Sequence, residues 1–575
     1  MRRVLVVLTI FALFASVRLR TTDRTTSNVV ELKPEEKIRT DNERTDKHES
    51  NIIEETNRSN LKEKGPVDDI RTQVPIGFVD EHVHGLDKLI DQALGKILGV
   101  PPSNENGTRS EFAKYALRDH SNDDLIYAST QVLISEAGFK HETHYVEADD
   151  GYITQLIHLI NPLADRKMLK YPPVAMFHGG TLDTSNYVMQ STRQHHPERW
   201  PRVLGETQTS WNRSLAFVLA NNGYDVWLVG SRGCNRANQG HRWLKKWMPL
   251  LSANTKTSPQ WLDSNWRETT KFWSNHTLED ILEKEVPRQL DRIMHLSGSK
   301  NVSIVTLSNS ATLALGLLSV RPDIAEKVHN FVAIAPVLSD KNSNRPDRVI
   351  YRTVCVDFND EIGVLFPELL LSRPVRDIWL ALVGSPFLRY TLLKWFTNNA
   401  FGPSPKFQTF IEPNVIGHVL GPFGYKSVKH LCQILAASKI QKYDYGALEN
   451  QIRYGSIRPP AYDLSKIRFN NWAIVSNAND GLYTMEDIHE LIEAIPIKPF
   501  KHIHNENANH IDSVAMADID IKINLPLLEF MDACPVTGIQ FVDRSEQQVL
   551  EDEKISRELE KFVSPDDRTI NGVHF

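Results

Sequence analysis

The chain has few cysteines and no strong excess of either charge. Its four cysteines, in 575 residues, include no C-x-x-C pair, so a zinc or dithiol site is not expected. The net charge of −6 gives no reason to expect nucleic acid as a partner. Internal repeats at solenoid or propeller spacing are also absent. With 41% hydrophobic and 24% charged residues, the composition is that of an ordinary globular protein.

Long apolar runs are missing too, except at residues 4–17, behind two arginines. This run is shorter than the ~20 residues that a membrane-spanning helix needs, and it is typical of a secretory signal. The cleavage region at 15–17 fits the preferred small-residue motif only loosely. Residues 1–17 are therefore predicted to be a signal peptide, with an uncleaved N-terminal anchor as the alternative. Both interpretations predict the secretory pathway.

Sequons for N-glycosylation fit this route. They occur at Asn57, Asn106, Asn212, Asn275 and Asn301. An oxidising compartment would also permit disulfides, and Cys355–Cys432 is the first pair to consider because both cysteines fall in one predicted insertion.

The segment 18–110 is polar. Up to about residue 74 it cannot bury enough apolar surface to fold, so it is predicted to be disordered. Leucine and isoleucine recur at helical spacing over 84–100, which predicts an amphipathic helix. Docking of this helix on the body of the protein is favoured over a position at a membrane surface.

From about residue 120 onward, strand-like and helix-like segments alternate. Residues 143–148 and 152–159 flank an Asp-Asp-Gly turn and predict a β-hairpin. Further strands are expected at 174–177, 225–229, 302–307, 328–334 and 469–476, and helices at 214–221, 277–296 and 311–319. This alternation predicts an α/β fold with a doubly wound, mostly parallel sheet.

Residues 338–460 interrupt the alternation with apolar residues at helical spacing. We interpret them as a helical cap inserted between two parts of the sheet domain, 120–337 and 461–535. Residues 536–575 are predicted to form a polar tail with one exposed helix near 546–562.

The most informative turn joins the strand 302–307 to the helix 311–319. Ser308 lies there among small or polar residues, in the outline of a nucleophile elbow, which presents a serine at a tight strand-to-helix turn. The usual pattern is G-x-S-x-G, whereas this sequence reads Thr-Leu-Ser-Asn-Ser. A polar turn between two core elements would explain the same residues, so the downstream sequence decides.

A serine hydroxyl becomes a good nucleophile when a histidine takes its proton and a carboxylate fixes the tautomer of that histidine. In α/β-hydrolases the acid and then the histidine follow the serine along the chain. Asp480 follows the strand 469–476 by a short turn, and His510 stands just before an apolar helix. Singly, a surface aspartate or a satisfied histidine explains each residue. Their order and placement together favour a triad with Ser308.

Acyl transfer also needs N–H donors for the oxyanion. One donor is expected from Asn309, which follows the nucleophile. The strand 174–177 ends in His-Gly-Gly, and glycine lets backbone approach a substrate closely, so the Gly180 N–H is the second candidate. His178 is expected only to brace this loop.

These segments resemble the acid lipases of the gastric and lysosomal type, a family that includes fungal steryl ester hydrolases. LANNGYDVWLVGSRG at 219–233 is close to the family's LAxxGYDVWLGNSRG and is the most specific match. FHGGTLDTSNY at 177–187 resembles QHGLLDSSxxW, and NHID at 509–512 resembles NHLD. The resemblance covers about residues 120–535. It implies an α/β-hydrolase fold, with Asp480 and His510 on the catalytic acid and histidine of the family.

The sequence departs from the family at the elbow, which lacks the family's histidine and both glycines. Larger residues two positions before and after the nucleophile strain the turn, although Thr306 and Ser310 are still small. The segment 477–479 has also lost the glycines that precede the acid in the family.

The resemblance implies a carboxylic ester hydrolase, secreted or lysosomal, that acts on triacylglycerols or steryl esters at a lipid–water interface without a metal or other cofactor. Peripheral membrane association fits such a substrate. The alternative, from another class, is a catalytically inactive lipid-binding protein that keeps the fold with a degenerate elbow. A serine peptidase shares the residue order, but no propeller repeat precedes the core and the match at 219–233 points elsewhere.

Overall fold

The computed structural model describes residues between 125 and 574, with gaps. Its main described ranges are 128–164, 172–190, 213–234, 240–242, 275–339, 401–404, 423–469, 471–534 and 545–563, with a few single positions and short segments besides. The predicted signal or anchor at 1–17 and the polar segment 18–110 lie outside the described residues. So do Asn57, Asn106, Asn212 and most of the first half of the predicted cap.

A nine-stranded sheet forms the core, in the order β1-β2-β4-β3-β6-β7-β10-β11, with β5 paired to β2. The strands are β1 (Lys140–Glu147), β2 (Tyr152–Ile160), β3 (Val174–Phe177), β4 (Val226–Val229), β5 (Gly240–His241), β6 (Val302–Leu307), β7 (Val328–Ile334), β10 (Asn471–Asn477) and β11 (Lys501–Asn505). The pairs from β4 to β11 are parallel, and those of β2 with β1, β4 and β5 are antiparallel. The predicted hairpin and the mostly parallel sheet are therefore confirmed.

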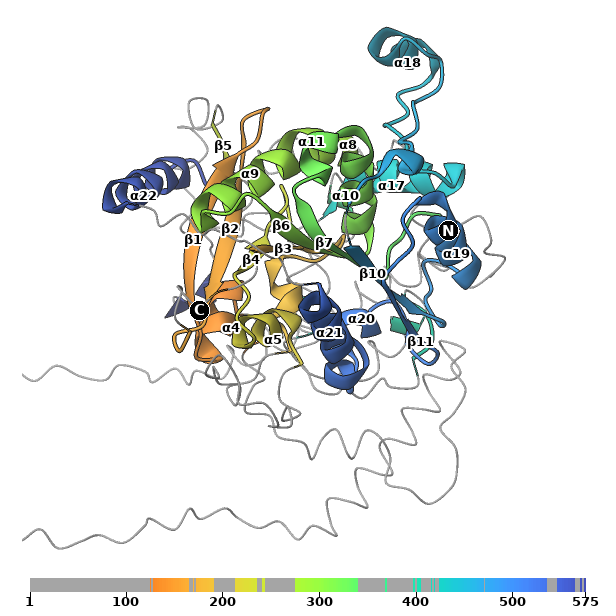
Figure 1. Ribbon diagram of the computed structural model, residues 1–575. Coiled ribbons are helices and arrows are strands. Elements are labelled where there is room, and N and C mark those ends of the chain that lie inside the picture. Colours follow the sequence, from red (N-terminus) through yellow and green to blue (C-terminus); the bar gives the residue numbers. More distant parts are fainter. Residues whose placement is uncertain are drawn as a thin grey trace, which may run out of the picture. The chain divides into compact units, whose positions relative to one another are not determined.

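Helices cover both faces of this sheet (Figure 1). On one side lie α8 (Leu278–Asp280), α9 (Val286–Ser297), α10 (Asn309–Val320) and α11 (Pro322–Ala325); α8 runs into α9 through η6 (Ile281–Glu285). On the other side lie α4 (Thr130–Glu136), α5 (Leu215–Asn221), α20 (Asp512–Ala515) and α21 (Leu525–Ala533), the last preceded by η10 (Asp520–Asn524). The remaining elements of the core are η3 (Thr184–Tyr187), η9 (Leu464–Lys466) and α19 (Met485–Ala494).

Burial explains why the central strands read as continuous apolar runs. Every residue of β3, β4 and β6 is buried, as expected where helices cover both faces of a parallel sheet. The helix α10 is buried along nearly its whole length, because it packs between the sheet and the elements around it. This arrangement is the α/β-hydrolase fold.

Part of the predicted cap is described. It contains α17 (Tyr425–Ala437), α18 (Ala447–Tyr454) and a short antiparallel pair, β8 (Glu368–Leu369) with β9 (Phe423–Gly424). The pair was not expected from the sequence. No helix in the described part of the chain has the length and apolarity needed to cross a membrane.

The C-terminal region is less polar in its contacts than the sequence indicates. The helix α22 (Glu546–Glu560) forms as predicted, but Leu559 packs with Tyr145 and Ile153 of the hairpin, and Val563 lies against the same cluster. Asp552 is buried and pairs with Arg292 of α9. The expected exposed helix is therefore docked along one face through Leu559 and Asp552, whereas Leu550 and Ile555 stay exposed. A further short strand pair, β12 (Thr569–Ile570) with β13 (Val573–His574), follows it.

Candidate active site

Ser308 occupies the turn between β6 and α10. Its backbone has φ 59° and ψ −124°, a region that non-glycine residues seldom adopt. The Ser308 N–H donates to the carbonyl of Ile334, at the end of the neighbouring strand β7, over 2.8 Å. The strained conformation is therefore held by the sheet itself, as expected of a nucleophile elbow.

Two hydroxyl groups stand where this kind of turn usually has glycines. Thr306 Oγ1 donates to the carbonyl of Val332 over 2.8 Å. Ser310 Oγ accepts the N–H of Leu307 at 2.8 Å and lies 3.1 Å from the carbonyl oxygen of Phe177. Both side chains are buried. The elbow thus accommodates larger residues by bonding their hydroxyls to the strands on either side.

Asp480 and His510 meet Ser308 at the carboxyl ends of the strands. His510 Nε2 lies 2.9 Å from Ser308 Oγ, and His510 Nδ1 lies 2.7 Å from Asp480 Oδ2. The second carboxylate oxygen of Asp480 accepts the Leu482 N–H at 2.7 Å. The acid and the histidine are nearly inaccessible, at 2% and 5% exposure. Burial, together with the charge of Asp480, raises the pKa of the neighbouring Tyr483 far above its ordinary value, so this phenol stays neutral.

Buried amide side chains join the turn that carries the acid to the loop that carries the histidine. Asn477 Nδ2 donates to the carbonyl of Asn509 at 2.8 Å and to Ser513 Oγ at 2.7 Å. Asn505 donates in turn to Asn477 Oδ1 over 3.1 Å. Asn509 reaches the carbonyl of Gly402 over 2.8 Å. Asn477, in the segment that has lost the expected glycines, therefore cross-links the two loops.

A segment from the predicted cap braces the same two loops, and sequence reasoning did not find it. The Phe401 carbonyl accepts the N–H of Gly481 at 2.9 Å and that of His510 at 3.1 Å. The Phe401 ring stacks on the His510 imidazole, with centroids 6.1 Å apart and planes 15° apart. At Gly402, with φ +97°, an added Cβ would lie 1.9 Å from the carbonyl oxygen of Asn479. In the sequence, the only sign of this contact is the dipeptide Phe401-Gly402, in a segment that diverges from the family.

The glycine loop after β3 lies beside the nucleophile. A Cβ on Gly179 would lie 3.3 Å from Ser308 Cβ, and one on Gly180 would lie 3.2 Å from Asn309 Oδ1. Thr181 has φ 61°, so the chain turns sharply after the glycines. The two predicted oxyanion donors, Gly180 and Asn309, are therefore next to each other, at the N-terminus of α10.

His178 is bonded on both ring nitrogens. Its Nδ1 lies 2.8 Å from the Gly179 carbonyl, and its Nε2 accepts the Ser231 N–H at 3.1 Å. Burial lowers the pKa of His178, which favours the neutral ring that can donate at one nitrogen and accept at the other. The ring thus links the glycine loop to the turn after β4, which is the bracing arrangement expected from the sequence.

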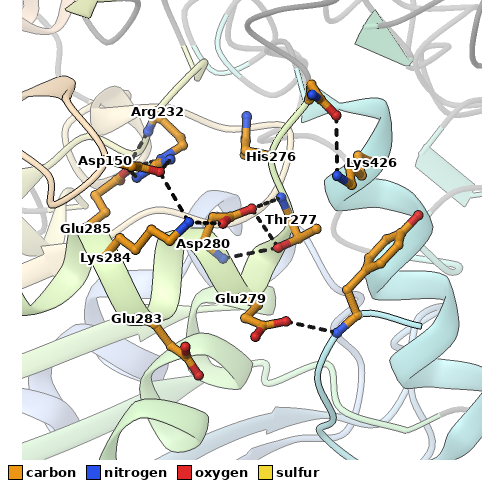
Figure 2. A network of polar contacts seen from close by, with 12 residues as sticks. Asp150, Arg232, His276, Thr277, Glu279, Asp280, Glu283, Lys284, Glu285 and Lys426 are labelled. Carbon is orange, nitrogen blue, oxygen red and sulfur yellow. Dashed lines mark hydrogen bonds and ion pairs between the residues drawn. The ribbon is translucent and has the colours of Figure 1, made fainter. Parts of the chain in front are cut away.

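Figure 2 shows how the turn after β4 is itself anchored. The Arg232 side chain is fully buried, binds Glu285 through Nε at 2.6 Å, and binds both carboxylate oxygens of Asp150 at 2.8 and 3.0 Å. Its guanidinium lies 4.1 Å from the centre of the Tyr152 ring. Burial opposes the charge, but the two carboxylates keep the pKa of Arg232 above its ordinary value. This ion-pair network fixes the hairpin and η6 around the turn that supports His178.

The other predicted positions are distributed as follows. Asn275 is exposed and accepts from Lys426 at 3.4 Å, while Asn301 is partly exposed and donates to the Lys327 carbonyl at 3.3 Å. Cys432 is disulfide-bonded, whereas Cys234 and Cys534 are not. Cys355 lies outside the described residues. Within the part of the chain that is described, no group of His, Cys, Asp and Glu side chains could hold a metal ion.

Comparison with known proteins gives the relatives of this chain. No protein-family model matches it. It is 22% identical over 481 residues to Lipase 1 of Drosophila melanogaster, covering 81% of this chain and 95% of the relative. It is 24% identical over 414 residues to human Lipase member K, covering 70% of this chain and 90% of the relative. The chain is a homologue of the acid lipases. Homology therefore places it among carboxylic ester hydrolases.

Solved structures give a weaker similarity. A soluble variant of monoglyceride lipase from Saccharomyces cerevisiae aligns with a TM-score of 0.38 and 10% identity, covering 69% of this chain and 97% of that one. At this level the fold assignment rests on the sheet order and the helical layers described above.

Proposed function

We propose that this acid lipase homologue hydrolyses lipid esters, triacylglycerols or steryl esters, through a Ser308–His510–Asp480 triad and an acyl-enzyme intermediate. The observation that carries the proposal is the unbroken pair of hydrogen bonds, 2.9 Å from Ser308 to His510 and 2.7 Å from His510 to Asp480. The names of two groups of relatives, gastric triacylglycerol lipase and lysosomal acid lipase/cholesteryl ester hydrolase, support the substrate class.

In the proposed reaction, Ser308 Oγ attacks the ester carbonyl while His510 Nε2 takes its proton. Asp480 accepts from Nδ1, which keeps the free Nε2 lone pair directed at the serine and stabilises the imidazolium that forms. His510 then protonates the leaving alcohol, and water, activated by the same ring, releases the fatty acid.

The backbone N–H groups of Gly180 and Asn309 are the proposed donors to the oxyanion. Their support is the placement of the glycine loop against the first residue of α10, where the helix dipole also favours negative charge. Loss of one such donor typically costs about 2.7–4 kcal/mol of transition-state stabilisation.

The test compares wild-type protein with Ser308→Ala on a fluorogenic fatty-acyl ester, emulsified triolein and cholesteryl oleate, from acidic to neutral pH. We expect the substitution to lower kcat by about 10⁴-fold or more. Ser303→Ala is the matched control, because this buried hydroxyl of β6 has no hydrogen-bond partner in the described part of the chain. The preferred emulsion identifies the lipid class.

The catalytically inactive lipid-binding protein is the second candidate, and the elbow without glycines is the observation that favours it. Folded wild-type protein that binds these lipids and hydrolyses none of them would establish this candidate. We further propose a secretory or lysosomal route, which the N-terminal apolar run and the names of the gastric and lysosomal relatives support.

A further inference from the structure

The helix α18 projects from the rest of the described chain beyond α17 (Figure 1). Three of its large apolar side chains, counting the turn that follows, face solvent. Leu448 is 79% exposed, Ile452 is 70% exposed and Ile457 is 62% exposed. Leu448 and Ile452 are four residues apart, so they share one face of the helix. An aliphatic surface at the tip of a projection needs an explanation, because folding has left most of it exposed to water.

Hydrogen bonds within the projection nevertheless hold α18 to the chain on either side of it. Asn450 is the only buried residue of α18. Its Nδ2 donates to Asp444 Oδ1 at 2.8 Å and to the Ile457 carbonyl at 3.2 Å, and its Oδ1 accepts the Tyr445 N–H at 3.0 Å. One amide side chain thus ties the helix to the chain entering and leaving it. We call residues 443–458 the α18 hairpin.

Aromatic and basic groups surround the base of the α18 hairpin. The Tyr443 and Tyr445 rings lie 4.6 Å apart, and Arg453 lies 4.3 Å from the centre of the Tyr445 ring. Tyr454 donates to Glu279 of α8 at 3.0 Å, and Lys442 also binds Glu279, at 2.9 Å. Lys426, which Figure 2 shows together with Glu279, lies 5.5 Å from the centre of the Tyr443 ring and 5.3 Å from that of Tyr445. The base is therefore fixed by polar bonds, and only the tip is aliphatic.

The charge and the aromatic groups of the α18 hairpin bear on the kind of surface that it fits. The α18 hairpin carries no net charge, because Asp444 and Glu449 balance Arg453 and Arg458. Arg453 is also paired with Glu449 at 2.6 Å. Aliphatic tip, tyrosines below it and arginines at its side are the order of groups found in interfacial helices, where the apolar face enters the acyl boundary and the rings and cations meet the headgroups.

We propose that the α18 hairpin docks the protein on a phospholipid-covered lipid surface by inserting Leu448, Ile452 and Ile457. The proposal rests on the proposed function, since a lipid ester substrate is presented at such a surface. A hairpin without net charge matches a zwitterionic phospholipid surface, where Tyr445 and the Arg453 beside it would meet the headgroups.

The test measures sedimentation of the full chain, in the Ser308→Ala background, with vesicles of phosphatidylcholine alone or mixed with phosphatidylglycerol. Leu448→Ser, Ile452→Ser and Ile457→Ser combined should weaken partitioning by at least about tenfold, because each residue loses aliphatic burial in the lipid. The matched control is Leu550→Ser with Ile555→Ser, exposed aliphatic residues of α22. Ile452→Trp should show blue-shifted fluorescence on vesicles.

Hydrolysis separates this proposal from the proposed function. With Ser308 intact, the triple variant should cleave a soluble butyrate ester at the wild-type rate and emulsified triolein more slowly. Unchanged vesicle partitioning of the triple variant would overturn the docking proposal and leave the hydrolase intact. Sedimentation velocity that finds a wild-type dimer and a monomeric triple variant would overturn it in favour of a second copy of the chain. Because partitioning is measured without catalysis, an inactive wild type would not affect this result.

Discussion

The turn that carries Ser308 and the turn that carries Asp480 differ in how closely neighbouring backbone approaches them. At the nucleophile turn, Thr306 and Ser310 fit with their side chains, because hydroxyls can bond to the adjacent carbonyls. At the acid turn, Gly402 packs its backbone directly on residues 479–481, leaving no volume for a methyl group. One turn has exchanged glycines for hydrogen bonds, and the other depends on a glycine that comes from a distant segment. The contrast teaches that a missing glycine motif does not by itself mean a damaged site.

The largest loss of activity is expected at Asp480, because His510 bonds to this residue and to Ser308 and so connects the two turns. Asp480→Asn keeps the size of the side chain but presents an amide that can donate to Nδ1, which favours the wrong imidazole tautomer. We expect kcat to fall by about 10⁴-fold, which is the effect of the same substitution in the Ser-His-Asp triad of a serine protease. Steady-state hydrolysis of a soluble ester measures it, and unchanged thermal unfolding is the control for the fold. A loss under tenfold would remove Asp480 from the proposed triad.

Gly402→Ala tests the contact on the acid turn. The methyl group would lie 1.9 Å from the Asn479 carbonyl oxygen, so the segment must move away from Asp480 and His510. We expect about a 10²-fold loss of kcat, the scale of a 1 Å misplacement of catalytic groups, together with lower stability.

The matched control for Gly402→Ala is Gly455→Ala. Gly455 also has a positive φ, of +69°, but nothing lies within 4 Å of an added Cβ. This control should cost only about 1 kcal/mol of stability and should not affect kcat. Equal kinetics of the two variants would show that Gly402 does not position the site.

The double variant Thr306→Gly with Ser310→Gly tests the nucleophile turn, because it restores the usual glycine pattern. Hydrolysis should stay within about tenfold of wild type, since glycine tolerates the turn. The free energy of unfolding should fall by about 1–3 kcal/mol, because two buried hydroxyls lose their bonds to backbone carbonyls. Urea unfolding measures the fall. A gain in stability would mean that these hydroxyls strain the elbow.

The smallest effect concerns pH and a buried pair away from both turns. His158 Nε2 lies 2.7 Å from Asp225 Oδ1, and Glu142 lies 3.5 Å from the other ring nitrogen. Burial opposes both charges, yet Asp225 raises the pKa of His158 above 6.5, and His158 lowers the pKa of Asp225 from 3.8 to about 2. A raised histidine pKa stabilises the fold below 6.5, and a depressed aspartate pKa stabilises it above 3.8.

The stabilisation by this pair is therefore complete between about pH 4 and 6.5. It is lost as the pH rises through the pKa of His158 or falls through that of Asp225. His158→Gln should lower the midpoint of urea unfolding most at pH 5, with a smaller difference from wild type at pH 9. The same difference at both values would mean that His158 is neutral in the folded protein.

Much of the fold and of the candidate site could be predicted from residues near each other in the chain. The run 174–177 is apolar and the run 302–307 is largely apolar, because both faces of a central parallel strand are covered. This pattern is visible without coordinates. Ser308, Asp480 and His510 follow strand ends in the order that the fold requires, so their convergence was predictable from topology. The docking of α22 on the hairpin was not predictable, because the few apolar residues of this polar helix show no clear helical periodicity.

The sequence by itself determined the order of strands and helices, the residues at the strand ends and the resemblance to acid lipases, because these depend on local patterns. Only the tertiary structure decided what holds those residues in place. The stacking of Phe401 on His510, the backbone contact at Gly402 and the bonds of Arg232 across 82 residues to Asp150 join segments whose separation hides the pairing. The physical reason is that close packing and buried hydrogen bonds depend on distance in space, which local sequence does not specify.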